Sequence, residues 1–309
     1  MTGGGVPRPA PANKTALAAR VRNAARSADL PEGRVQRQLG VLVVAELLGR
    51  VRNENGQQLF LVKGGSSIEL RLGVASSRTT KDLDAVFRGN FSRMYNTARD
   101  ALAVGWHGFS AVVTPPETIN APGLTAKPRR FKVKLSFVGQ PWCTVPVEVS
   151  AAESHSASHP ESVSPALFAH VGLLSLGLPE TSAVLCLPLN YQIAQKLHAC
   201  TGEDPGGRTN DRAHDLIDVL LLWNLVPRQE YPAVRIACVD IFVNRAMHSW
   251  PPQLLPPGPH RQVSDAECCS QLGQEPERGP QLARQARYGP KATIKPVPVF
   301  FIAQLTCVG

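Results

Sequence analysis

The sequence lacks the features that would place it in a membrane or outside the cell. None of its 309 residues belongs to an uncharged apolar run of about 18, the length of a membrane-spanning helix. The first eleven residues are rich in glycine and proline, whereas a signal peptide has a charged segment followed by an apolar one. We therefore expect a soluble, cytoplasmic protein that has no membrane partner.

The cysteines lack the spacing of a metal-binding or disulfide-bonded domain. The seven include no Cys-x-x-Cys pair and no ladder with histidine, which argues against a zinc site. Four of them stand among apolar neighbours, where a free thiol behaves as a small hydrophobic side chain: Cys143, Cys186, Cys200 and Cys238. Free thiols of this kind suit a reducing cytoplasm.

Two common catalytic loops are also absent. The glycine pair Gly64 and Gly65 is not followed by Lys-Ser or Lys-Thr at Walker A spacing. The stretch around Ser154 and His155 has no glycine elbow around a serine, which argues against a hydrolase triad. What the chain has instead is positive charge, with 33 Lys and Arg against 24 Asp and Glu and a net charge of +9. This balance favours a polyanionic partner such as nucleic acid.

Composition and periodicity divide the chain into four parts. Residues 1–55 carry two helical patterns, and residues 56–163 alternate between strand and helix patterns. Residues 164–250 carry three helical patterns. Residues 251–309 are rich in proline and show neither period, so we expect a poorly ordered tail that the function does not need. The order predicts an α/β or α+β fold in which a sheet domain precedes a helical domain.

Within these parts the patterns predict individual elements. Two helices between residues 14 and 52 are expected to be divided by Pro31 and Gly33. Strands are expected at 59–62, 82–87, 109–114, 131–137 and 144–150. Further helices are expected at 67–72, 91–103, 190–201, 211–223 and 231–247.

A glycine pair followed by an Asp-x-Asp strand is the strongest chemical signal. On a strand Asp82 and Asp84 point to one face, and two converging carboxylates are costly unless a cation lies between them. Hard divalent ions such as Mg²⁺ or Mn²⁺ take oxygen ligands of this kind. Upstream, Gly64 and Gly65 allow a sharp turn close to an anion, at the start of a helix. The pattern predicts a metal and triphosphate site; the alternative is an ordinary turn and a solvated strand edge.

This run resembles the signature of the AbiEii/MenT nucleotidyltransferase-like toxins, within the polymerase-beta-like nucleotidyltransferase superfamily. The residues that carry the resemblance are Lys63, Gly64, Gly65, Ser66 and Ser67, then Arg78, Thr79, Thr80, Lys81, Asp82, Leu83 and Asp84. Similarity extends from about residue 41 to 252. Family members often have serine where Thr80 stands, and threonine keeps the hydroxyl. The resemblance implies a mixed nucleotidyltransferase sheet with flanking helices and a helical C-terminal domain.

The pair of strands at 131–137 and 144–150 supplies a third acid. Glu148 faces opposite to the valines of its strand, as Lys132 and Lys134 face opposite to the apolar residues of theirs. In the superfamily a third carboxylate comes from such a strand, which implies that Glu148 is a metal ligand or the base that receives the proton of the attacking hydroxyl. The alternative is a cross-strand salt bridge from Glu148 to Lys132 or Lys134.

The same region is strongly basic. Five positive charges fall within eight residues: Lys127, Arg129, Arg130, Lys132 and Lys134. Such a cluster could follow a nucleic-acid backbone by contacting its phosphates. The alternative is a solvated basic surface.

The helical part carries a lysine and a row of aspartates. Asp211, Asp215 and Asp218 are spaced to share one helix face, and Lys196 on the preceding helix is their natural partner. We expect Ala213, Leu216, Ile217, Leu220 and Leu221 to form the buried stripe. The pattern resembles the second characteristic block of the AbiEii/MenT proteins, which implies that Lys196 contacts the nucleotide phosphates and that Asp215 or Asp218 helps to position the site. An interhelical ion pair without a chemical role is the alternative.

The resemblance implies a metal-dependent transfer of NMP from an NTP, with release of pyrophosphate. It assigns Asp82, Asp84 and Glu148 to the metal ions and Lys196 and Asp218 to catalysis. It assigns these residues to the NTP: Lys63, Gly64, Gly65, Ser66, Ser67, Arg78, Thr80 and Asp215. The implied acceptor is the 3′ end of tRNA, so that translation is blocked, and the implied partner is a cognate antitoxin. A transferase that modifies a protein and a catalytically idle binding module are the alternatives.

Overall fold

The computed structural model describes residues 8–73, 77–121, 124, 126–165, 172–201 and 212–252. Asp211 and the predicted tail beyond Pro252 lie outside the described residues. The chain divides into two compact units: Met1–Ala152 with His159–Leu187, and Glu153–Ser158 with Pro188–Gly309. No helix among the described residues is both long enough and apolar enough to cross a membrane. The four-part division of the sequence stays a prediction.

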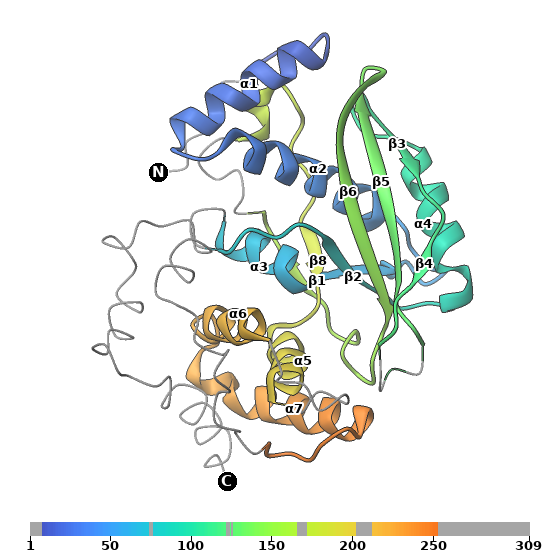
Figure 1. Ribbon diagram of the computed structural model, residues 1–309, viewed down its shortest axis with the longest axis vertical. Coiled ribbons are helices and arrows are strands. Elements are labelled where there is room, and N and C mark those ends of the chain that lie inside the picture. Colours follow the sequence, from blue (N-terminus) through green and yellow to red (C-terminus); the bar gives the residue numbers. More distant parts are fainter. Residues whose placement is uncertain are drawn as a thin grey trace. The chain divides into compact units, whose positions relative to one another are not determined.

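The first unit is built on a mixed sheet in the order β3-β5-β6-β2-β1-β8-β7, with β4 paired to β5 (Figure 1). The strands are β1 (Phe60–Lys63), β2 (Leu83–Phe87), β3 (Phe109–Val113), β4 (Glu117–Thr118), β5 (Arg129–Phe137), β6 (Gln140–Ala151), β7 (Glu161–Val163) and β8 (Val184–Cys186). β2 runs parallel to β6 and β1 parallel to β8, whereas the other pairs are antiparallel. The predicted mixed sheet is confirmed.

α2 (Glu32–Gly49) and α4 (Met94–Ala103) pack together against one face of this sheet, and α1 (Lys14–Ser27) packs on α2. α3 (Gly64–Leu72) follows β1 directly, and two short 3₁₀ helices lie at Phe91–Arg93 and Leu173–Leu176. α1 begins where the Asn13 side chain accepts a hydrogen bond of 2.9 Å from the Ala16 amide. Along β5, Phe131, Val133 and Leu135 are buried in the same core as α2 and α4. The other face of β5 is therefore left to its polar residues.

The second unit is helical, as predicted. It contains α5 (Leu189–Thr201), α6 (Ala213–Trp223), a short 3₁₀ helix (Arg228–Glu230) and α7 (Tyr231–Arg245). The buried side chains include Ile193 and Leu197 of α5, Leu222 of α6 and Phe242 of α7. These positions recur at helical spacing, which is why the sequence pattern located all three helices.

The structure corrects several predicted elements. α3 begins at Gly64, three residues before the predicted start, and β2 begins at Leu83, so that Asp82 precedes the strand. The two- and three-residue strands β4, β7 and β8 were not predicted, because alternation cannot be recognised over so few residues. The buried stripe of α6 is Ile217, Asp218, Val219, Leu222 and Trp223, whereas Leu216, Leu220 and Leu221 are partly exposed.

Candidate active site

A row of charged side chains crosses the sheet of the first unit. The strand register pairs Lys63 of β1 with Asp84 of β2, and pairs Asp84 with Glu148 of β6. Glu148 is in turn paired with Arg130 of β5. Residues that are directly paired on neighbouring strands point to the same face of a sheet. Two carboxylates therefore lie side by side, with a cation at each end of the row.

Arg130 is the residue that holds Glu148. Its guanidinium donates a hydrogen bond of 2.9 Å to Glu148 Oε2. This bond raises the pKa of Arg130, against a smaller effect of burial, and the charges of Glu148, Asp82 and Glu117 also raise it. The alternative considered from the sequence, a salt bridge from Glu148 to Lys132 or Lys134, is not formed. Those lysines lie opposite Pro146 and Thr144 in the register.

The three predicted metal ligands differ in their surroundings. Asp84 and Glu148 are strand neighbours, whereas Asp82 precedes β2 and Glu148 is engaged by Arg130. Within the described part of the chain, no three His, Cys, Asp or Glu side chains form a group that could hold a metal ion. The three half-buried carboxylates offer only oxygen atoms as ligands, and oxygen is the ligand atom that Mg²⁺ and Mn²⁺ prefer. Metal binding by these residues stays a prediction.

The two glycines place the start of α3 against the Asp-x-Asp segment. Gly64 has φ of +62°, and a Cβ atom at this position would overlap the Asp84 carboxylate. A Cβ atom at Gly65 would lie 2.9 Å from Thr80 Oγ1 and 3.2 Å from the Arg78 guanidinium. Both positions therefore require the smallest side chain for close packing, and Gly64 also for its backbone conformation.

The beginning of α3 has the character of an anion-binding site. Lys63 is its N-cap residue, and the Lys63 side chain makes no capping hydrogen bond. The first-turn amides and the helix dipole favour negative charge at this end. The Lys63 ammonium lies nearby in the charged row and donates a hydrogen bond of 2.7 Å to Ser150 Oγ. The helix start, Lys63 and Arg78 thus surround one end of the carboxylate pair with positive potential.

The hydroxyl groups of the signature act inside the fold. Ser66 Oγ and Thr80 Oγ1 both donate to the backbone carbonyl of Asp82, at 2.8 and 3.2 Å. Ser67 is fully buried, and its hydroxyl accepts a hydrogen bond of 3.3 Å from Arg71 Nε. These contacts fix the backbone that leads into Asp82. A direct contact of the hydroxyls with phosphate stays a prediction.

A buried ion pair that the sequence did not reveal supports the Thr80 segment. Glu69 of α3 accepts a hydrogen bond of 3.3 Å from the Thr80 amide and forms an ion pair of 3.5 Å with Arg34 of α2. Arg34 also donates to the Ser77 carbonyl at 2.7 Å. Burial raises the pKa of Glu69 and lowers that of Arg34, and each charge opposes the effect on the other. An arginine inside the apolar stripe of α2 was the one available signal for this pair.

The second unit contains its own charged cluster. Lys196 Nζ donates to Asp215 Oδ1 at 2.9 Å and to Asp218 Oδ2 at 2.6 Å, and Arg212 donates to Asp215 at 3.2 Å. Asp218 is completely buried. Burial lowers the pKa of Lys196, but the two aspartates outweigh it, so that the pKa is raised overall. The interhelical ion pair considered from the sequence is thus present, and Asp211 lies outside the described residues.

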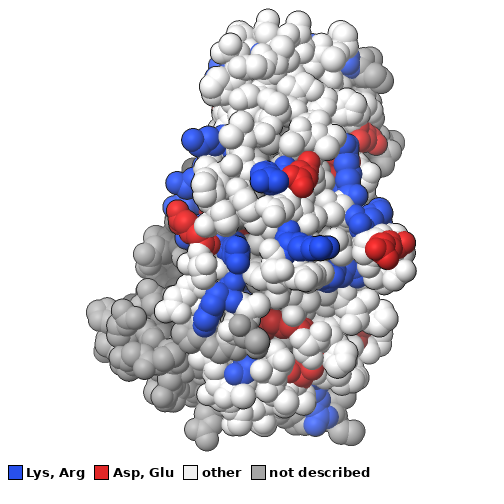
Figure 2. Space-filling view, turned by 90° about the vertical axis from the view of Figure 1, so that its right-hand side faces the viewer, with Lys and Arg blue, Asp and Glu red and all other residues white. Residues whose placement is uncertain are grey.

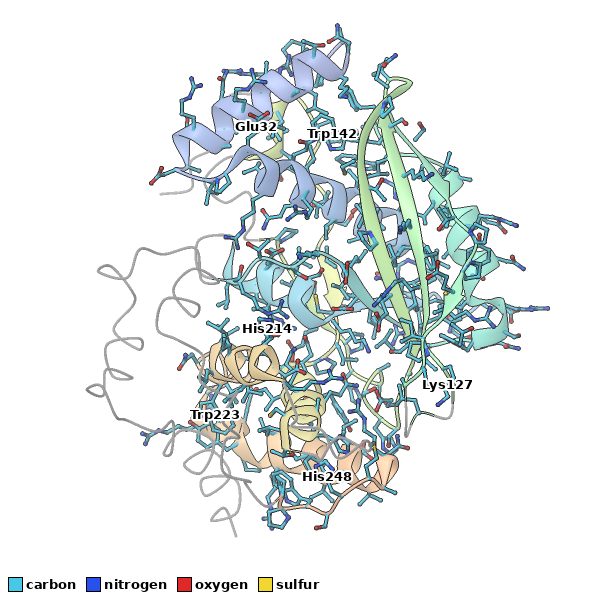
Figure 3. All side chains as sticks on the ribbon, viewed as in Figure 1. Glu32, Lys127, Trp142, His214, Trp223 and His248 are labelled. Carbon is cyan, nitrogen blue, oxygen red and sulfur yellow. The ribbon has the colours of Figure 1, made fainter. Side chains whose placement is uncertain are left out.

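The basic cluster of residues 127–134 does not form a single patch. Arg129 and Arg130 are neighbours on a strand, so their side chains point to opposite faces, and Arg130 is engaged by Glu148. Lys127 donates to the Ala121 carbonyl at 2.8 Å and lies near one end of the β5–β6 pair, opposite Trp142 at the other end (Figure 3). Figure 2 shows a face of the molecule on which Lys and Arg side chains are spread widely, with acidic side chains among them.

His198 is a buried base that stays neutral near pH 7. It packs against Phe242, and its Nδ1 atom lies 3.4 Å from the Arg245 guanidinium, which also binds Glu153 at 2.7 and 3.0 Å. Burial, followed by the charge of Arg245, lowers the pKa of His198 to about 3. Because the folded protein disfavours the protonated form of His198, the folded state is fully stable only above the unfolded pKa near 6.5. Stability is lost as the pH falls from there toward 3, where the folded form also becomes protonated.

We therefore expect acid sensitivity in the second unit. The free energy of unfolding should fall by about 1.4 kcal/mol per pH unit below pH 6, because the unfolded chain binds one more proton at His198. Urea unfolding at a series of pH values between 4 and 8 measures this dependence of the free energy of unfolding on pH. The slope should be smaller in His198→Gln and unchanged in His159→Gln, which alters an exposed histidine. Equal slopes in all three proteins would contradict the assignment.

Gly64→Ala tests the packing at the start of α3. We expect a loss of about 1–2 kcal/mol in stability from the left-handed backbone, and loss of any activity that needs Asp84, because the new methyl group displaces its carboxylate. Gly33→Ala in α2 is the matched control, since nothing lies within 4 Å of its Cβ position. Thermal unfolding and an activity assay of both variants measure the difference. Equal behaviour of the two would show that Gly64 does not pack against Asp84.

Comparisons with known proteins agree with this architecture. The family model described as "Nucleotidyl transferase AbiEii toxin, Type IV TA system" matches residues 46–279. The fold is similar to that of MenT4, a nucleotidyltransferase toxin from Mycobacterium tuberculosis H37Rv, with 16% identity and a TM-score of 0.52 over 94% of this chain and 86% of that chain. The antibiotic-resistance factor ANT(2'')-Ia matches at 16% identity over 74% of this chain and 91% of that chain, with a TM-score of 0.33 that supports no inference. No curated protein sequence matches the chain.

Proposed function

Because the chain belongs to the AbiEii family of nucleotidyltransferase toxins of type IV toxin–antitoxin systems, we propose that it transfers NMP from an NTP to the 3′ end of an RNA, with tRNA as the acceptor. The main support within the chain is the pair of carboxylates Asp84 and Glu148, with Asp84 packed against Gly64 at the start of α3. Transfer to the tRNA end would prevent aminoacylation and block translation in the cytoplasm. The family implies a cognate antitoxin as a partner.

The proposed reaction is an in-line displacement at the α-phosphorus of the NTP. The terminal hydroxyl oxygen of the RNA forms the new P–O bond, the bond to the bridging oxygen of the β-phosphate breaks, and pyrophosphate leaves. Mg²⁺ or Mn²⁺ held by Asp82, Asp84 and Glu148 would supply positive charge at the phosphate oxygens and make the hydroxyl more acidic. In the residues that the structure describes, Glu148 Oε1 accepts no hydrogen bond, which suits a metal ligand or the acceptor of the hydroxyl proton.

The chain's own cations would bind the triphosphate. The amides of Gly64, Gly65 and Ser66 at the start of α3 are suited to phosphate oxygens, with Lys63 and Arg78 as charged neighbours. Ser66 and Thr80 would act by fixing the Asp82 backbone, and Ser67 by packing under the helix start. In the second unit, Lys196 would supply positive charge that transfer requires, and Asp215 and Asp218 would orient it.

The acceptor is tested by following the label of an α-labelled NTP. The protein is incubated with Mg²⁺, each labelled NTP, total RNA and total protein, and the products are separated by class. We expect label in RNA of tRNA size. Label in protein would replace the proposal by a protein-modifying transferase, and label in neither would favour a binding module without catalysis.

A further inference from the structure

The exposed face of β5 carries a line of cations that starts at the carboxylate pair. Arg130, Lys132 and Lys134 alternate with the buried Phe131, Val133 and Leu135 and are all exposed. Alternate residues of a strand lie about 7 Å apart on the same face. Because Arg130 is paired with Glu148, the line leads away from Asp84 and Glu148 in steps of about 7 Å.

The two lysines of this line are not neutralised by their neighbours. Lys132 lies opposite Pro146 of β6, and Lys134 lies opposite Thr144 of β6 and Val112 of β3. None of these partners is acidic, and no described carboxylate forms an ion pair with either lysine. The nearest acids in the register, Glu148 and Glu117, are both paired with Arg130. The positive charge of Lys132 and Lys134 is therefore available to an external anion.

We propose that the RNA acceptor binds along the exposed face of β5, with its phosphates on Lys132 and Lys134 and its end directed toward Asp84 and Glu148. The inference rests on the proposed function and adds the surface that receives the acceptor. A regular row of cations suits a phosphate backbone, which carries negative charge at regular intervals. Exposed Val112, with 68% of its surface accessible, lies beside Lys134 and offers an apolar contact to a base.

The test uses the full chain and a matched change in charge. The double variant K132Q/K134Q removes the two cations, and R26Q/R93Q removes two exposed charges from other parts of the first unit. Binding of labelled tRNA without NTP is measured between 50 and 300 mM salt. We expect K132Q/K134Q to lose affinity for tRNA by about tenfold at 0.1 M salt. The slope of the logarithm of the binding constant against the logarithm of the salt concentration should fall by about 1.4, because each lost phosphate contact to a single strand accounts for about 0.7. R26Q/R93Q should change neither.

Transfer is measured separately, so that the two proposals can fail separately. For K132Q/K134Q we expect a higher KM for RNA and an unchanged KM for NTP, because the lysines contact only the acceptor. Wild-type protein that labels RNA, together with unchanged RNA affinity and KM in K132Q/K134Q, would overturn the β5 surface alone. Wild-type protein that binds tRNA but labels no RNA would overturn the proposed function.

Discussion

Asp84→Asn is expected to reduce nucleotide transfer on the order of a thousandfold or more while the first unit keeps its fold. Asp84 lies beside Glu148 and against Gly64, where a neutral amide of equal size fits but cannot replace a charged oxygen ligand. Removal of one carboxylate from an acidic pair also relieves repulsion and opens no cavity. Asp82→Ala should have the same effect, because the proposal places both aspartates at the metal.

The measurement is the transfer rate together with the thermal midpoint of each variant. Asp100→Asn in α4 provides a control, since it makes the same chemical change at an exposed aspartate paired with Arg99. Near-wild-type transfer by Asp84→Asn or Asp82→Ala would remove these residues from the metal site. A midpoint far below that of the control would mean that the carboxylates serve the fold.

Lys196→Ala is expected to affect both stability and turnover. The ammonium is nearly buried between Asp215 and Asp218, so its removal leaves the fully buried Asp218 charge without this partner. Breaking such a buried pair costs about 3–5 kcal/mol. Turnover should also be lost, and Lys196→Arg should not restore it, because a planar guanidinium replaces a compact charge.

A variant in which the whole cluster is neutral separates the two effects. In K196M/D215N/D218N no charge remains buried without a partner, so stability should largely return. Urea unfolding and labelled transfer are measured on the same samples. If transfer returns with stability, or if Lys196→Arg has the full rate, Lys196 is only an ion-pair partner and its proposed role in transfer is wrong.

The sequence predicted what depends on local pattern. The alternation of β5 placed Phe131 and Val133 in the core and Lys132 and Lys134 outside, and helical spacing located α5, α6 and α7. The juxtaposition of Gly64 with Asp84 was foreseen only as two neighbouring motifs. Their contact depends on how α3 returns to β2, which no local period encodes.

What could not be predicted depends on register. Arg130 lies opposite Glu148 because of how β5 and β6 pair beyond an irregularity at Leu135 and Ser136, and this register cannot be read from either strand alone. For the same reason the alternative salt bridge of Glu148 was considered with Lys132 or Lys134 and not with Arg130. The burial of Asp218 was also missed, because a charged residue inside an apolar stripe looks like an exposed one until its partner Lys196 is placed.

Whether the NTP gives up its α-phosphate is decided by the position of the label in the product. Purified protein is incubated with tRNA and Mg²⁺ and with NTP labelled at either the α- or the γ-phosphate, and Asp84→Asn serves as the inactive control. We expect the α-label at the tRNA 3′ end and the γ-label in the released pyrophosphate. Transfer of the γ-label to RNA, or no label in RNA from either NTP, would show that the chain does not transfer NMP to tRNA.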